Sequence, residues 1–482
     1  MAESKNAAAV CDTQKPPLNS PSFGSGESRR DFFARFGRLL LIIAAQNVVV
    51  YGVNLLDNVM IGRLGEASEV ALSGVFIVNQ IQFLLQMICV GIADGVSVLV
   101  SRYWGENNIP GIKKACACSM HFALAASLIM MAAVYIFPRG VLSLFSDKPY
   151  VIEEGVKYML LVAPTYVFFA ATQVLLGVLR SVECSFIGFV TSCAALVTNL
   201  TLNYLLIYGH MGFPALGIRG AAVATLISRL VEFAIVIVYL AVYDKRIRLS
   251  VRDFLASDSD TTKKFIKVSV PVLMSAASWG VAMGLQTAIL GRLADSVISA
   301  NSIASTVYQI MSVFISGAAT ASAIMVGKMI GQAGAEGVPY DALLRETKVR
   351  CNILQLIFIS TGIITGILLY FSRSAIISLY EISEETREVA MQFMAILSVT
   401  AVGTSYEMTC LTGIVRGGGD TKFVFYNDIV FMWCIVLPCS FIAAFVLKLS
   451  PAYIFITLKA DQILKCFVAV FKVNRYKWIK KF

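Results

Sequence analysis

Residues 57–64 read DNVMIGRL, and residues 286–293 read QTAILGRL. The shared Gly-Arg-Leu pairs Arg63 with Arg292 at an offset of 292 − 63 = 229. One such match alone is weak, because three residues recur by chance in a long chain. A second motif at the same spacing is needed before a repeat can be inferred.

Residues 175–181, LLGVLRS, and residues 411–417, LTGIVRG, supply that second motif. Both fit Leu-x-Gly-x-x-Arg and pair Arg180 with Arg416 at an offset of 416 − 180 = 236. Two different motifs at nearly the same offset indicate a duplicated half of roughly 230 residues. Duplicated halves in an apolar chain are typical of secondary transporters, in which one half moves against the other around a shared site.

The composition places this duplicated chain in a membrane. Of its 482 residues, 57% are hydrophobic and only 15% are charged, whereas a soluble protein carries roughly 25% charged residues. A chain this apolar cannot bury its side chains in a water-soluble core, so lipid must be the solvent for most of it. The sequence therefore predicts an all-α integral membrane protein.

Apolar runs long enough to cross a bilayer, at least about 18 residues each, occur twelve times along the chain. They are 36–62, 70–99, 115–138, 152–179, 185–208, 219–243, 265–290, 299–327, 349–371, 386–415, 422–447 and 451–471. The last run is the least regular, because Lys459, Asp461 and Lys465 interrupt it. Six spans in each half bring both copies into the membrane from the same side, so the two repeats are parallel.

Lysine and arginine set the predicted orientation. With the N-terminus inside, cytoplasmic segments carry roughly 28 of these residues and outer loops about 8. We therefore expect both termini in the cytoplasm and the protein in the plasma or inner membrane. This topology explains the net charge of +10, and no basic helix or aromatic-rich fold supports nucleic-acid binding.

These observations divide the chain into five predicted parts. They are a disordered cytoplasmic tail at 1–35, an N-terminal six-helix lobe at 36–243, a cytoplasmic linker at 244–264, a C-terminal six-helix lobe at 265–472 and a basic cytoplasmic tail at 473–482.

Asp57 is the first candidate for chemistry, because ionisable groups inside a membrane are costly and mark functional sites. Asn47, Asn54 and Asp57 lie within roughly 80° of one another on a helix and form one polar stripe. A carboxyl in a low-dielectric cavity can take up a proton near neutral pH or bind a cation. The alternative is a structural carboxyl that pairs with Arg63.

Asn199 and Asn203 in the fifth span stand four residues apart and share one helix face. Two carboxamides at this spacing can coordinate a cation through oxygen or donate hydrogen bonds to a carboxylate. They can equally hold helices together, as polar residues often do in membranes. The residues alone leave both readings open.

The second half carries its own polar candidates. Gln286 is the repeat mate of Asp57 (286 − 229 = 57), so the duplication kept an acid in one copy and an amide in the other. Glu407 and Asp428 are intramembrane acids for which the sequence shows no local partner. Gln286, Glu407 and Asp428, with Asn47 and Asn54, are therefore candidates for lining the substrate cavity.

Two further charged positions lie in spans of the first half. In the sixth span, Arg229 and Glu232 stand three residues apart and predict a structural ion pair. Asp94, in the second span, has no obvious helical partner and receives no role.

The two Leu-x-Gly-x-x-Arg motifs predict structural turns or hinges rather than a ligand site. Their residues are Gly177 and Arg180 in the first copy, and Gly413, Arg416 and Asp420 in the second. The glycines after Arg416 permit a tight turn, and Asp420 or Thr421 is expected to cap the next helix. The stretch Gly-Gly-Gly-Asp also matches the GxGD of intramembrane aspartyl proteases, which need a second membrane-embedded Asp, commonly after Tyr. The two Tyr-Asp pairs here, at 243–244 and 340–341, fall in predicted loops. An enzyme is therefore not expected.

These motifs together resemble the MATE (multidrug and toxic compound extrusion) transporters, over residues 36–472. The resemblance rests on D-x-x-x-x-G-R-L near the end of the first span, N-x-x-x-N before LLIYG, and the paired G-x-x-R-[GS] turns. It implies twelve helices in two six-helix lobes around a V-shaped central cavity. It also implies export of amphiphilic, often cationic compounds in exchange for H⁺ or Na⁺.

Carried over by position, Asp57 looks like the family's first-span acid implicated in cation coupling, and Asn199 and Asn203 look like its fifth-span partners. The chain departs from the family at Asn203, where part of the family has Asp, and at Ile42, where many members have proline. It departs again at 180–185, RSVECS, where glycine followed by Asp or Asn is usual. With one carboxyl and neutral amides, the first lobe suits proton coupling better than a Na⁺ cage.

The alternative function is a lipid-linked saccharide flippase of related architecture. Such a protein would be expected to line its cavity with basic residues that hold a pyrophosphate, whereas the acids counted here outnumber Arg229, the main intramembrane base. We expect a monomer in the lipid bilayer that acts on small amphiphilic cations and uses no cofactor or metal.

Overall fold

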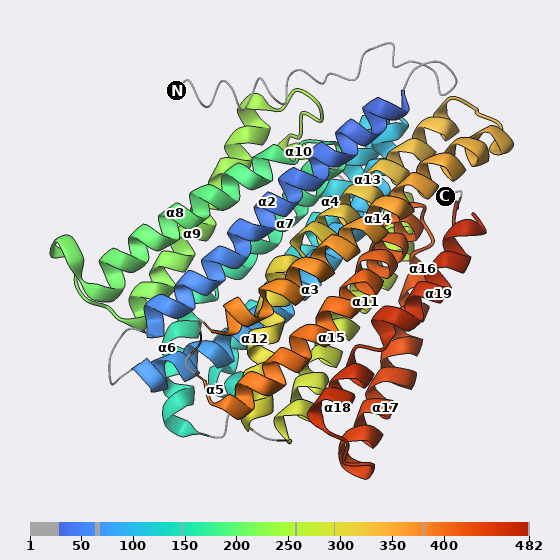
Figure 1. The fold of residues 1–482 in the computed structure, drawn as a ribbon. Coiled ribbons are helices and arrows are strands. Elements are labelled where there is room, and N and C mark those ends of the chain that lie inside the picture. The colour runs from blue at the N-terminus through green and yellow to red at the C-terminus, as the bar shows by residue number, and fades with distance from the viewer. Residues whose placement is uncertain are drawn as a thin grey trace. The chain divides into compact units, whose positions relative to one another are not determined.

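The computed structural model describes residues 28–62, 68–145, 148–255, 258–293, 295–378, 380 and 382–480, and they are almost entirely helical (Figure 1). The helices of the first half are α2 (Arg29–Gly62), α3 (Ser68–Gly105), α4 (Ile109–Ile136), α5 (Pro138–Ser143), α6 (Pro149–Val162), α7 (Thr165–Ser181), α8 (Phe186–Tyr208), a 3₁₀ turn η2 (His210–Gly212), α9 (Ile218–Val238), a π turn η3 (Tyr239–Tyr243) and α10 (Val251–Leu255).

The second half repeats this pattern with more interruptions. Its elements are α11 (Ser259–Gly291), α12 (Asp295–Met311), α13 (Val313–Ala335), α14 (Tyr340–Ile377), α15 (Glu384–Met408), η4 (Thr409–Val415), α16 (Thr421–Ile429), η5 (Val430–Val436), α17 (Leu437–Phe441), η6 (Ile442–Val446), α18 (Pro451–Leu458) and α19 (Asp461–Asn474). The stretches η4, η5 and η6 are π-helical. Such wide turns concentrate at functional sites.

Each of the twelve predicted spans falls on described helix. Ten helices are long and apolar enough to cross a membrane, and α6 with α7 forms a further span bent by 52°. The bend lies at Pro164, whose ring cannot donate the backbone hydrogen bond that would continue α6. The predicted runs 299–327 and 451–471 are also broken, at Ser312 between α12 and α13 and at Lys459–Ala460 between α18 and α19.

Side-chain caps fix two of the span starts. Asn108 Oδ1 accepts a hydrogen bond of 2.9 Å from the Gly111 amide at the start of α4, and proline follows in the first turn. Ser383 Oγ accepts from the Thr386 amide at 3.2 Å at the start of α15, where Glu384 and Glu385 complement the helix dipole. These capping hydrogen bonds fix where the preceding loops end and where α4 and α15 begin.

The helices form two compact units. The first contains residues 45–100 and 108–269, and the second contains residues 28–44, 101–107 and 270–480. The units follow the two repeats with three exceptions: the start of α2 and residues 101–107 at the end of α3 belong to the second unit, and the start of α11 belongs to the first. The beginning of α2 therefore packs in the apolar core of the second unit, where Phe32 and Phe36 are buried.

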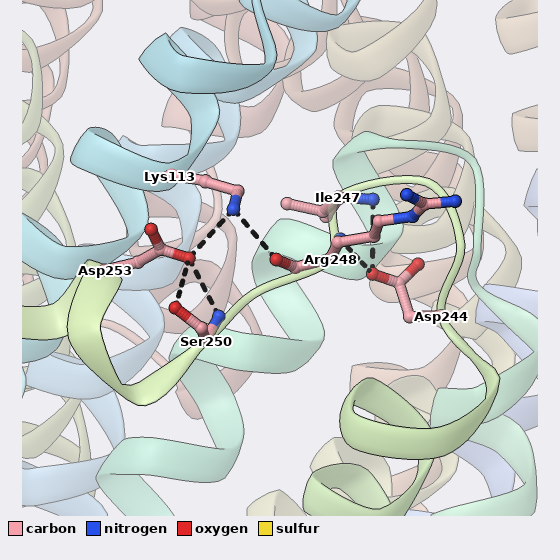
Figure 2. Close-up of polar contacts among 6 residues, drawn as sticks. All are labelled: Lys113, Asp244, Ile247, Arg248, Ser250 and Asp253. Carbon is pink, nitrogen blue, oxygen red and sulfur yellow. Dashed lines mark hydrogen bonds and ion pairs between the residues drawn. The ribbon is translucent and has the colours of Figure 1, made fainter.

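The stretch between the repeats is anchored on the first unit (Figure 2). The Asp244 carboxylate accepts hydrogen bonds from the amides of Ile247 and Arg248, at 3.2 and 2.9 Å. Lys113 Nζ, on α4, donates to the Arg248 carbonyl at 2.8 Å and to Asp253 Oδ2 at 2.9 Å. The predicted linker is thus a folded segment that includes α10 and is fastened to α4.

Candidate functional site

Lys465 on α19 is the centre of a charged cluster inside the second unit. Its side chain is 7% exposed, and its ammonium lies 3.1 Å from Asp428 Oδ1 and 3.4 Å from Asp461 Oδ2. Asp461 stands one turn earlier on the same helix, whereas Asp428 comes from α16. A buried ammonium in a membrane protein needs such partners, because an isolated buried charge is strongly unfavourable.

Asp428 links three helices of the second unit. Its Oδ1 faces Lys465, and its Oδ2 accepts a hydrogen bond from Ser275 Oγ on α11. The sequence shows no local partner for Asp428, and in the folded chain its partners are indeed distant ones. Its partners lie 37 and 153 residues away, so helical spacing could not reveal them.

Glu407 lies at the end of α15, directly before the π-helical stretch η4. It is half-buried and within electrostatic range of Lys465, Asp461 and Asp428. We call these four residues and Ser275 the Lys465 cluster. Among the residues that the structure describes, Glu407 has no ion pair, whereas both aspartates contact Lys465. Glu407 is therefore the carboxyl of the cluster that remains open to a proton or a cation.

Gln286 on α11 lies in the same unit and is 4% exposed. Its amide nitrogen donates to the Met432 sulfur at 3.4 Å, and its Oε1 accepts a hydrogen bond of 3.4 Å from Lys459 Nζ. The repeat mate of Asp57 is thus engaged by a lysine at the break between α18 and α19. Its carbonyl oxygen occupies the place where a carboxylate would form an ion pair.

The charged residues of the last span are the functional candidates that sequence reasoning missed. Lys459, Asp461 and Lys465 were treated as interruptions of an apolar run. The signal was present, since three ionisable residues in one predicted span are costly unless they meet partners. Their partners Gln286 and Asp428 lie on other helices.

In the first unit, Asn199 and Asn203 share one face of α8, as the spacing predicts. Both are buried, and Asn203 Nδ2 donates to Asn199 Oδ1 at 3.0 Å. Ser192, two turns earlier on α8, is also buried, and in the described part of the chain its hydroxyl has no hydrogen-bond partner. The middle of α8 thus presents a run of polar groups; their predicted role in ion coupling stays a prediction.

Two contacts set α2 beside α8. Gly188 makes room for Gln46, since a Cβ at Gly188 would lie 2.8 Å from Gln46 Oε1. Further along, the Tyr208 hydroxyl donates to the Met60 carbonyl at 2.8 Å. The two helices therefore run parallel.

This register locates position 57 along the helix pair. Position 57 precedes Met60 by three residues and Asn203 precedes Tyr208 by five, so their backbones are within about two turns of each other along the helices. The side chains of Asn54 and Asp57 lie outside the described residues, and Asn47 is half-buried.

Arg229 and Glu232 form the ion pair that their spacing predicts. Arg229 Nη1 lies 2.8 Å from Glu232 Oε2, and its guanidinium stacks over the Phe169 ring at 5.0 Å from the centroid. Glu232 is 3% exposed. The pair neutralises a buried acid within one helix, so Arg229 is not available as a free base in the first unit.

The two repeat motifs mark sites of close helix packing. A Cβ at Gly177 would lie 3.1 Å from the Ala93 side chain, and one at Gly413 would lie 3.0 Å from the Ala319 carbonyl oxygen. The glycines therefore let α7 approach α3, and η4 approach α13, at equivalent places in the repeats. Arg180 and Arg416 follow at the ends of these helical stretches.

Asp420 does not cap α16, contrary to the prediction. Its side chain makes no capping hydrogen bond. Instead, its Oδ2 lies 2.8 Å from Lys472 Nζ and 3.7 Å from Lys480 Nζ. Lysines beyond the last span attract the carboxylate away from the helix start, and the acid fastens the C-terminal segment to the turn.

The chain is similar to multidrug transporters over almost its whole length. It is 24% identical over 406 residues to a "Probable multidrug resistance protein NorM" of Photorhabdus laumondii, covering 83% of this chain and 85% of that one. It is 23% identical over 479 residues to a "Probable multidrug resistance protein YoeA" of Bacillus subtilis, covering 98% of both. These relatives extend the likeness beyond the quoted motifs.

Solved structures share the fold. A crystal structure of a MATE protein in complex with MaL6 superimposes with a TM-score of 0.81 at 18% identity, covering 92% of this chain and 95% of that one. A MOP superfamily transporter from Pyrococcus furiosus, described with a binding pocket of reversed polarity, superimposes with a TM-score of 0.81 over 93% of this chain and 96% of that one, at 18% identity. At these identities the likeness establishes the architecture alone.

The sequence profile of the MatE family matches two stretches, residues 43–205 and 271–442. Their starts are 271 − 43 = 228 residues apart, which agrees with the offset of the Gly-Arg-Leu motif. The matches cover more than half of the chain, and therefore the protein belongs to the MatE family of multi-pass membrane transporters, as the resemblance implied.

Proposed function

We propose that the protein exports amphiphilic, often cationic compounds by alternating access, in exchange for H⁺ or Na⁺. The observation that carries the proposal is the Lys465 cluster, in which two aspartates contact one ammonium and Glu407, within electrostatic range of it, is without an ion pair in the described chain. Intramembrane acids of this kind mark ion and proton pathways in transporters.

The first unit supports a second coupling group. The register of α2 against α8 brings the backbone of position 57 near the level of Asn203, and α8 contributes neutral amides and no acid there. One carboxyl among neutral oxygens suits the uptake of a single proton. We therefore propose H⁺ as the coupling ion, with Na⁺ as the alternative.

The charge balance of the second unit argues against an anionic cargo. The buried Lys465 is occupied by two aspartates, and the half-buried Lys459 by Gln286. Arg229 of the first unit is occupied by Glu232. A pyrophosphate-carrying lipid would need free basic groups, so the flippase alternative is not favoured. The proposed setting is the plasma membrane, with the protein acting as a monomer on small drug-like cations and both termini in the cytoplasm.

Transport by everted membrane vesicles tests this function. The vesicles take up a fluorescent organic cation while a proton gradient and a Na⁺ gradient are imposed separately. We expect accumulation driven by the proton gradient, loss of that accumulation in Glu407→Gln, and normal accumulation in Glu388→Gln. Glu388 lies exposed on the same helix and controls for the substitution. Accumulation that neither gradient drives would reject cation coupling.

A further inference from the structure

The residues that follow α19 fold back onto the second unit. We call residues 475–480 the C-terminal strap. Trp478 at its centre is 0% exposed and lies in the apolar core that also contains Phe32 and Phe36 from the start of α2. The Trp478 indole N–H donates to the Val473 carbonyl at 2.9 Å. A buried tryptophan with its N–H satisfied is a strong anchor.

The strap is fastened to the turn between η4 and α16. The Lys480 amide donates to the Gly418 carbonyl at 3.1 Å, and Asp420 holds Lys472 and Lys480. A Cβ at Gly418 would lie 2.1 Å from the Trp478 ring. Only glycine therefore allows Trp478 to lie against this turn.

The first repeat has an equivalent arrangement. Arg246, in the stretch after its last span, donates through Nη1 to the Val182 carbonyl at 2.9 Å. Val182 is the repeat mate of Gly418, because 418 − 236 = 182. In each repeat, the segment after the last helix thus docks on the turn that follows Leu-x-Gly-x-x-Arg. In the first repeat this segment is the anchored linker of Figure 2.

The strap also contacts α3. Arg102, at the end of α3, donates through Nη1 to the Lys480 carbonyl at 2.8 Å. The repeat mate of Arg102 is Lys328, because Gly105 aligns with Gly331 at an offset of 331 − 105 = 226. The peptide groups around Lys480 therefore join α3 of the first repeat to the Gly418 turn of the second.

The end of α3 also crosses α13 at very close range. A Cβ at Gly331 would lie 2.1 Å from the Arg102 carbonyl oxygen, and one at Gly105 would lie 2.1 Å from the Lys328 carbonyl oxygen. Small residues at such crossings let helices meet tightly but add no side-chain hydrogen bond of their own. The strap supplies that bond through Arg102.

We propose that the C-terminal strap is a latch that holds the end of α3 against α13. Residues 101–107 belong by sequence to the first repeat but pack in the second unit. If the first repeat carries the end of α3 with it during transport, this crossing has to separate. The latch then opposes that movement, and release of Lys480 from Arg102 precedes it.

Hydrogen exchange on the full-length protein in lipid nanodiscs tests the latch without a transport substrate. Arg102→Gln removes the link between α3 and the strap together with the ion pair of Arg102 with Glu106 at 3.2 Å. Glu106→Gln removes that ion pair alone and is its control, whereas Trp478→Ala removes the anchor of the strap and leaves the ion pair in place. Matched controls are Arg139→Gln, whose side chain is 75% exposed, and Trp279→Ala, which is 47% exposed. The measured quantity is the exchange rate of the amides of residues 101–107 and 475–480.

We expect the amides of 101–107 to exchange about tenfold faster or more in Arg102→Gln and Trp478→Ala, as loss of a hydrogen bond to a charged group implies. In Arg102→Gln the Lys480 amide should stay protected by Gly418, which separates loss of the latch from general unfolding. Unchanged exchange of 101–107 in Arg102→Gln would overturn the proposal, and so would an equal increase in the controls. Since the readout is structural, it can fail or succeed independently of the proposed transport function.

Discussion

The ion pair between Lys465 and Asp428 gives the sharpest quantitative test of the buried cluster. We consider Asp428→Asn, Lys465→Met and the double variant. Asp428→Asn removes one of the two carboxylates on Lys465 but leaves Asp461 at 3.4 Å. Lys465→Met leaves two buried carboxylates facing each other without the ammonium between them.

The structure sets the expected size of each effect. Removing one partner of a buried ion pair costs about 3–5 kcal/mol. We expect less than this, about 2–3 kcal/mol, for Asp428→Asn because Asp461 remains, and about 3–5 kcal/mol for Lys465→Met. The double variant removes both charges of the pair, so its loss should fall short of the sum by about 1.5–3 kcal/mol.

The free energy of unfolding is measured in mixed detergent micelles for all four proteins. A parallel cycle on Asp260 and Lys264 is the control, because this pair has the same residue types at 2.8 Å but side chains 73% and 41% exposed. Its coupling should be only about 0.3–0.5 kcal/mol. A coupling energy between Lys465 and Asp428 no larger than that of the exposed pair would show that burial does not strengthen this ion pair.

Three further predictions concern coupling, topology and the linker. Asp57→Asn should abolish coupled efflux with normal expression, and wild-type efflux in this variant would remove Asp57 from the mechanism. Cysteines introduced in place of Asp258 and Glu384 should react with an impermeant reagent from opposite sides of the membrane; reaction from one side would overturn the topology. Burial alone would raise the pKa of Asp253, but the hydrogen bonds from Lys113 and a backbone amide outweigh it and lower the pKa. The linker's stabilisation is therefore present above about pH 4 and lost as the pH falls through that lowered pKa. Pepsin should cut Asp253→Asn faster than wild type near pH 4.5 but equally near pH 2, where the Asp253 carboxyl is protonated in the wild type, and a difference that persists at pH 2 would contradict this.

Sequence reasoning reached the parts of the fold that depend on local spacing. The twelve apolar runs all fall on helix, and Arg229 and Glu232 pair because residues three apart are neighbours on any helix. For the same reason Asn199 and Asn203 meet on α8. The two repeats could also be predicted, because the same motifs recur at a fixed spacing within the one chain.

The remaining features depend on which helices become neighbours, and spacing along the chain does not determine this. Ser275, Asp428 and Lys465 come from three helices that are far apart in sequence. Asp420 illustrates the same limit, because its position at a helix start predicts a cap, yet lysines from the chain end compete successfully for its charge. The lysines of the last span have partners on other helices, and these partners explain how the protein accommodates their charges.

Purified protein in liposomes can show whether an organic cation is exchanged for a proton. The liposomes are loaded with an amphiphilic cation and a pH-sensitive dye, in buffers free of Na⁺, and the cation is then diluted outside. We expect the interior to acidify as the cation leaves, because each exported cation brings a proton inward, and we expect no acidification in Asp57→Asn liposomes. Cation release without acidification, or release that begins only when Na⁺ is added outside, would contradict this expectation.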